Sequence, residues 1–184
     1  HFWVTSRIKR MAKLTGSIDV PLPPNEAWMC ASDLARFGEW LTIHRAWRSK
    51  LPEVVEKGTV IESYVEVKGM PNRIRWTVVR YKAPEAMTLN GDGVGGVKVK
   101  LIAKVSPKDD GSVVSFDVHL GGSALFGPIG MIVAVALRTD IRESLQNFVT
   151  AFSRPEPGLI RSRALVVDQH SRAVVEQRSA SAGL

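Results

Sequence analysis

Residues 89–105, LNGDGVGGVKVKLIAKV, hold four glycines at positions 91, 93, 95 and 96, followed by an alternating run. A glycine-rich loop that binds phosphate must follow a strand and open a helix, so that backbone N–H groups and the helix dipole face the ligand. Here residues 97–101 alternate between apolar and charged, which is the period of a half-buried strand. No Lys-Ser or Lys-Thr pair closes the loop. The segment therefore predicts strands that bend or pack closely at the glycines, where absent side chains leave room for a cavity.

Alternation on both sides of this segment indicates further strands. Short turn signals at residues 69–72, 84–85 and 109–111 separate most of them, which predicts antiparallel pairing in a meander. Local turn hydrogen bonds from Asn90 and Asp92 are also expected. The predicted strands cover residues 13–20, 48–51, 59–68, 73–81, 87–89, 97–105 and 113–120.

Helical patterns occupy two places in the chain. Pro24 and Glu26 begin a helix over residues 24–34, since proline suits a first helical turn and an acid there meets the dipole. A second short helical turn follows at residues 35–41, and residues 42–47 are expected to form a loop. The last helix spans residues 127–152. Its second half has one apolar stripe, whereas its first half is apolar all round, so that half must be covered or must face a ligand or partner.

The order of these elements predicts an α+β helix-grip fold. A curved antiparallel sheet would wrap the long C-terminal helix, and two short helices would follow the first strand. The concave face of such a sheet must be apolar. We therefore expect the ligand cavity to lie in the gap between that face and the long helix.

The formal net charge of +7 over 184 residues lies mostly at the two ends. Residues 1–13 hold four basic and no acidic residues, and residues 154–184 hold five arginines and three acids, so residues 14–153 are left with 16 basic and 15 acidic residues. Nucleic-acid binding needs a basic stripe on a folded surface, and this distribution argues against it. We expect residues 1–10 to be an upstream or added extension, 11–153 the domain, and 154–184 a linker and poorly ordered basic tail.

Cysteine and hydropathy patterns restrict the class of protein further. A lone cysteine, Cys30, cannot form an intrachain disulfide and fits a cytoplasmic location. No run approaches the roughly 20 apolar residues that span a bilayer, so no membrane insertion is expected. The chain lacks H-x-x-x-H and C-x-x-C spacings, and a metal site or other cofactor is not expected. Residues 121–125 also lack the final glycine of a nucleophile elbow.

Five phrases carry a resemblance to a known family: DVPLPPNEAW, DLARFGEWLTIHRAWRSKLP, VEVKGMPNRIRWTV, MTLNGDGVGGVKVKL and LFGPIGM. Over about residues 11–153 they resemble the SRPBCC (START-like) superfamily of polyketide cyclases/dehydrases and lipid transport proteins. They are most similar to a mycobacterial, hence actinobacterial, branch associated with the toxin component of type II toxin–antitoxin pairs. The resemblance implies a helix-grip fold with an apolar cavity. It implies no single chemistry, since binders, carriers and enzymes share the fold.

The candidate ligand-binding residues combine aromatic side chains with a few polar groups. His44, flanked by two tryptophans, is the candidate for an acid/base role, with Asp140 or Asp92 as a second group. Asp140 could instead form an ion pair with Arg138 or a neighbour. The tryptophans could instead pack in the core. The full set is Trp40, His44, Trp47, Trp76, Asp92, Phe116, Phe126, Met131, Val135 and Asp140.

Three functions remain open at this stage. The first hypothesis is a binder of a hydrophobic small molecule that acts as a toxin. A small antitoxin protein would then cover either the first half of the last helix or the loop around His44. The alternatives are a simple carrier of lipid or another hydrophobic ligand, and a cyclase- or dehydratase-like enzyme. An enzyme should bring two or more ionisable groups together in the cavity.

Overall fold

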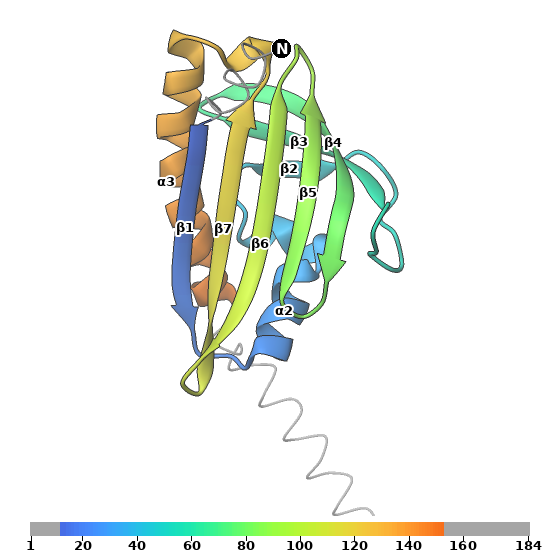
Figure 1. Ribbon diagram of the computed structural model, residues 1–184, viewed down its shortest axis with the longest axis vertical. Helices are drawn as coiled ribbons and strands as arrows, with labels where there is room; N and C mark the ends of the chain where they lie inside the picture. The colour runs from blue at the N-terminus through green and yellow to red at the C-terminus, as the bar shows by residue number, and fades with distance from the viewer. Residues whose placement is uncertain (1–11, 153–184) are drawn as a thin grey trace, which may run out of the picture. The chain divides into compact units, whose positions relative to one another are not determined.

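A computed structural model describes residues 12–152 of the chain, so the predicted extension and tail lie outside the described residues. Seven strands form one antiparallel sheet in the order β1-β7-β6-β5-β4-β3-β2 (Figure 1). The strands are β1 (Ala12–Val20), β2 (His44–Trp47), β3 (Val60–Val67), β4 (Met70–Lys82), β5 (Ala86–Gly93), β6 (Lys98–Lys108) and β7 (Gly111–Gly121). The helical elements are α2 (Pro24–Ser32), η1 (Leu34–Glu39), η2 (Ser123–Leu125) and α3 (Pro128–Phe152).

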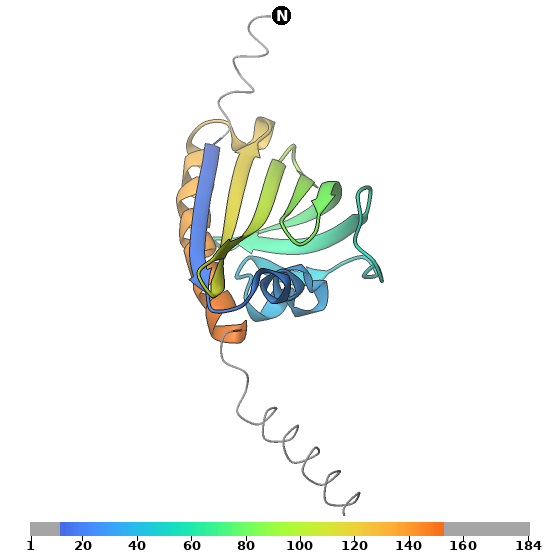
Figure 2. The same ribbon diagram turned by 60° about the horizontal axis from the view of Figure 1, so that its bottom comes forward.

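The sheet curls strongly, and its concave face is covered by two different sets of elements. Figure 2 shows α3 running along the β1 side, while α2 and η1 lie under the opposite part of the sheet. Strands β2 to β7 follow one another along the chain, and β1 joins the meander by pairing with β7. This arrangement confirms the predicted α+β helix-grip fold.

The glycines of residues 91–96 serve two structural purposes. Gly91 pairs with Trp76 across β4 and β5, and a Cβ built on Gly91 would lie 2.8 Å from a ring carbon of Trp76. The missing side chain therefore makes room for the indole. Gly95 and Gly96 have φ values of 79° and 80° in the β5–β6 hairpin, a conformation that side chains disfavour. No helix follows these glycines, as the alternation predicted.

Two local predictions are corrected by the structure. The strand expected at residues 48–51 is displaced to β2, so His44 lies in a strand and not in a loop, because this segment pairs with β3. In the β5–β6 hairpin, the side-chain amide of Asn72 bonds both backbone groups of Val94, accepting at 2.9 Å and donating at 3.3 Å. The expected turn hydrogen bonds from Asn90 and Asp92 are not formed in the described hairpin, because Asn90 lies within β5 and Asp92 pairs with Lys98.

Helix α3 is buried along its second half and exposed along its first. Leu145 and Phe148 are 3% and 0% exposed and belong to the main core with Phe116. On β1, Gly16 allows close approach, since a Cβ there would lie 2.6 Å from the Ile141 side chain. The first half packs only its inner side, through Leu137, against a smaller cluster. The predicted apolar first half is therefore left uncovered on its outer side.

Candidate ligand cavity

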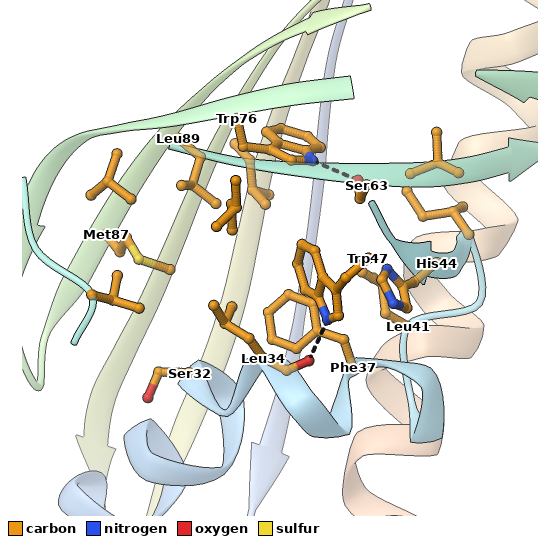
Figure 3. A pocket seen from close by; sticks show the side chains of 16 residues that line it. Ser32, Leu34, Phe37, Leu41, His44, Trp47, Ser63, Trp76, Met87 and Leu89 are labelled. Carbon is orange, nitrogen blue, oxygen red and sulfur yellow. Dashed lines mark hydrogen bonds between the residues drawn. The ribbon is translucent and has the colours of Figure 1, made fainter. Parts of the chain in front are cut away.

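A cavity lies between the concave face of β3, β4 and β5 and the segment formed by α2, η1 and β2 (Figure 3). Its volume is about 50 Å³, whereas a cavity that holds a single water needs roughly 10 to 15 Å³. Helix α3 contributes no lining residue, so the cavity is not in the gap where the sequence placed it. The lining residues are Ser32, Leu34, Phe37, Leu41, Ile43, His44, Trp47, Val55, Ile61, Ser63, Val65, Trp76, Val78, Met87, Leu89 and Leu101.

An aromatic cluster from η1 and β2 forms one wall. The Trp47 ring centroid lies 4.7 Å from that of His44 and 5.4 Å from that of Phe37. The Trp47 indole Nε1 donates a 2.7 Å hydrogen bond to the Leu34 backbone oxygen, which ties β2 to η1. With its polar edge satisfied in this way, the indole presents apolar surface to the cavity.

The opposite wall contains one buried polar pair. Trp76 Nε1 donates a 3.0 Å hydrogen bond to Ser63 Oγ, and Ser63 is only 2% exposed (Figure 3). The pair lies on neighbouring strands, since Ser63 is in β3 and Trp76 in β4. A hydroxyl that accepts one bond keeps its own hydrogen, and no acceptor for that hydrogen is found among residues 12–152. Ser63 can therefore donate to a ligand.

His44 is the one ionisable side chain that lines the cavity. Burial, with a smaller contribution from the Arg45 charge, lowers the pKa of His44 below its ordinary value. The ring is therefore neutral at physiological pH, with one nitrogen that donates and one that accepts. Within the described residues, neither nitrogen has a hydrogen-bond partner. His44 can thus bond a hydroxyl or a carbonyl group.

The structure brings three of the ten sequence-predicted site residues together: His44, Trp47 and Trp76 line the cavity. The other seven lie elsewhere. Trp40 stacks on Phe116 with centroids 5.8 Å apart in the core, and its buried Nε1 has no hydrogen-bond partner among the described residues. Asp92 is exposed and paired with Lys98, Asp140 faces Thr42, and the last three are exposed on or near α3: Phe126, Met131 and Val135.

Asp140 has a structural role that the sequence did not predict. Its Oδ1 accepts a 2.9 Å hydrogen bond from Thr42 Oγ1, and Ser144 Oγ accepts a 3.0 Å bond from the Thr42 backbone nitrogen. The expected ion pair with Arg138 is absent from the described ion pairs. These bonds anchor the start of β2 to α3, and they hold the Asp140 carboxylate away from the cavity lining.

Ser63, Phe37 and Met87 are cavity residues that the sequence analysis did not select. Ser63 carried a usable signal, because it is the one polar residue among Ile61, Val65 and Val67 on the inward face of its strand. Phe37 and Met87 carried none, since an apolar residue has the same pattern whether it borders a void or a filled core.

None of the described helices is long and apolar enough to cross a membrane. In the same residues, no group of three or more His, Cys, Asp or Glu side chains is placed to hold a metal ion.

Comparison with known proteins gives a consistent result. Over 143 residues the chain is 84% identical to Toxin Rv0910 of Mycobacterium tuberculosis, covering 78% of this chain and 99% of that protein. The crystal structure of the Zhui aromatase/cyclase from Streptomyces sp. R1128 has a TM-score of 0.65 at 10% identity, covering 79% of this chain and 95% of that one. A START superfamily protein from Mycobacterium smegmatis has a TM-score of 0.57 at 13% identity, covering 77% and 94%.

Residues 11–153 match the family model described as polyketide cyclase / dehydrase and lipid transport. The match includes every element that forms the sheet, the cavity and α3. Together with the START-like architecture, it confirms the family resemblance inferred from the sequence. This chain belongs to the polyketide cyclase/dehydrase and lipid transport family of the START-like (SRPBCC) superfamily.

Proposed function

We propose that the cavity binds an uncharged, mainly apolar small molecule. The observation that carries this proposal is the composition of the lining: among its 16 residues there is no Asp, Glu, Lys or Arg, and the one ionisable group is a histidine held neutral by burial. A ligand charge buried among these residues would be unpaired, which costs several kcal/mol. Selection against charge follows directly.

The ligand's position follows from the same walls. Its apolar part would lie between the Trp47 and Trp76 rings, and its polar group would bond Ser63 Oγ or a His44 ring nitrogen. A volume of about 50 Å³ corresponds to a few water molecules and is smaller than the roughly 150 Å³ of an apolar cavity that binds benzene. A small ring would therefore enter by displacing part of the cover formed by α2, η1 and β2. The preferred ligand is therefore a neutral monocyclic or short-chain compound with one hydroxyl or carbonyl group.

A matched pair of probes tests this proposal. We expect 4-ethylphenol to quench tryptophan fluorescence and to shift the NMR signals of Trp47 and Trp76, whereas 4-ethylbenzoate at the same pH should bind at least tenfold more weakly, about 1.4 kcal/mol. Leu89→Trp, which fills the cavity, should abolish binding, and Val135→Ala on the outer side of α3 should not change it. Equal binding of the two probes, or unchanged binding by Leu89→Trp, would overturn the proposal.

We further propose that the protein inhibits growth as a toxin in the cytoplasm, together with a small antitoxin protein. The support is the 84% identity to a protein named as a toxin. Inducible expression of the full chain, with and without co-expression of any small protein encoded beside its gene, is the direct test. We expect slowed growth that co-expression relieves. Unchanged growth on induction at a verified protein level would remove this role while leaving the ligand proposal intact.

Catalysis of a cyclisation or dehydration is the second candidate function, supported by the neutral His44 inside the cavity. A single imidazole would have to act as both proton acceptor and proton donor, because no second ionisable group lines the space. His44→Gln should then abolish turnover of a trial polyketide while keeping binding of 4-ethylphenol. Turnover that survives this change would exclude acid/base catalysis by His44.

A further inference from the structure

The outer side of the first half of α3, with the loop before it, forms an exposed apolar surface. It consists of Phe126, Ile129, Met131, Ile132 and Val135, whose exposed fractions range from 47% to 73%. Together these side chains expose on the order of 500 Å², near the top of the range for the largest apolar patch of a monomer. We call this set the α3 patch. Residues 129, 132 and 135 follow one another at helical spacing, so they form a ridge along the helix.

The first charged residue that follows the α3 patch along the helix is basic. Residues 118–139 contain no acid, and Arg138 and Arg142 continue the exposed row of α3 immediately after the patch. Neither arginine forms an ion pair with another described residue. The nearest acids on the helix are Asp140, which is bonded to Thr42, and the exposed Glu143.

Neighbouring elements add further basic groups. The turn between β3 and β4 lies beside this half of α3, since Val67 packs in the same cluster as Val133 and Leu137. This turn contains the exposed Lys68. Strand β1 also packs against α3 and has the exposed Lys13 at its start. The α3 patch thus has basic residues at its end and on the two neighbouring elements.

We propose that the α3 patch is the docking surface for an acidic amphipathic helix of a partner protein, and this rests on the proposed toxin role, in which that partner is the antitoxin. The partner's apolar stripe would pack along the ridge of residues 129, 132 and 135, and its carboxylates would lie opposite Arg138 and Arg142. Residues 129–142 span about 20 Å at 1.5 Å per residue, which matches three to four turns of a partner helix.

Charge distinguishes this partner from the other possible occupants. A second copy of the chain packed by two-fold symmetry would bring two sets of unpaired arginines to one interface, where like charges are unfavourable. An anionic bilayer would attract the basic groups. It would not, however, require that the arginines lie at one end of the apolar ridge only. A helix with acids beyond its apolar stripe matches both features.

Two synthetic peptides of about 18 residues, long enough to form a helix, test the proposal. Both carry the same leucine stripe, flanked in one by glutamates and in the other by lysines. With the full chain at low salt, fluorescence anisotropy should show at least tenfold tighter binding of the glutamate peptide. Ile132→Glu should weaken that binding at least tenfold, and the double variant Arg138→Glu/Arg142→Glu should reverse the preference. Gln146→Glu, further along the exposed face, is the matched control.

Several other outcomes would overturn the docking proposal. Equal binding of the two peptides, or no effect of Ile132→Glu in a variant shown by circular dichroism to be folded, would exclude the docking site. If the protein bound vesicles of phosphatidylcholine and phosphatidylglycerol more tightly than the glutamate peptide, and the Ile132→Glu variant did not bind them, the patch would be assigned to lipid. A dimer in light scattering that Ile132→Glu dissociates would assign it to a second copy. A failed growth assay with the expected peptide result would reject the toxin role alone.

Discussion

The two halves of the concave sheet face are closed in different ways. Over β1 and β7, the second half of α3 packs directly on the strands, and Leu145 and Phe148 are almost fully buried. Over β3, β4 and β5, the cover is the short segment of α2, η1 and β2, and the cavity lies there. Both halves are apolar, so hydrophobicity alone does not decide which one is filled.

Two glycines on the inward face make room for side chains from different elements. Gly16 on β1 allows the Ile141 side chain of α3 to approach, and the space is filled by the helix. Gly91 on β5 makes room for the Trp76 ring of the neighbouring strand. A long regular helix can follow a strand closely, whereas a 3-10 turn with large rings leaves gaps that those rings cannot fill. Irregular cover thus creates a cavity.

The largest effect should come from removing a ring in the filled half. Phe148→Ala is expected to lower the free energy of unfolding by about 3 to 5 kcal/mol, because this side chain is fully buried and contacts the Trp40 ring. Met87→Ala, at the cavity wall, should lower the free energy of unfolding by about 2 kcal/mol, since the cavity already leaves one side of the Met87 side chain without packing contacts. Urea denaturation of both variants gives the comparison, and equal costs would show that the halves are packed alike.

Adding a methyl group at Gly91 should sharpen the comparison. The new Cβ would lie 2.8 to 2.9 Å from carbons of Trp76 and Ile74, so Gly91→Ala should cost about 1 to 3 kcal/mol and displace the indole. Gly38→Ala is the matched control, because nothing lies within 4 Å of its added Cβ. Thermal melts and 4-ethylphenol titration measure both. Normal stability with normal probe binding would mean that Gly91 is not needed for the Trp76 position.

Ser63→Ala should have a smaller effect, about 1 kcal/mol. It removes the acceptor for Trp76 Nε1, whose hydrogen bond is 3.0 Å long, and so leaves that donor without a partner. Denaturation in a double-mutant cycle with Trp76→Phe isolates the pair, because the indole donor is absent from the second variant. An additive cycle would show that the hydrogen bond contributes nothing to stability.

The pH dependence of His44 should be the smallest effect. Because burial lowers the folded-state pKa of His44, the unfolded chain takes up this proton first as the pH falls. The free energy of unfolding should therefore be undiminished above the unfolded value of about 6.5 and should decrease as the pH falls through the folded pKa. His44→Gln should flatten this dependence, and NMR titration of the ring should give a midpoint below 6.5. A midpoint at or above that value would contradict the buried position.

Local pattern was sufficient for most of the fold. Alternation at residues 59–68, 73–81 and 113–120 predicted strands that the structure contains, because a strand with one buried face must alternate with period two. The apolar stripe of residues 137–152 likewise predicted the second half of α3. The strand at residues 44–47 was missed, since a segment of four residues is too short to show a clear period. Its pairing with β3 depends on tertiary contact.

By itself, the sequence determined the class of this protein: an antiparallel meander closed by a long helix, with an apolar interior and a net charge close to zero over residues 14–153. Tertiary structure decided where the interior is empty. Trp40 and Trp47 are seven positions apart in one short segment, yet Trp40 stacks on Phe116 in the core while Trp47 lines the cavity. Their different positions depend on residues far away in the chain, and a void is the result of how those distant side chains pack together.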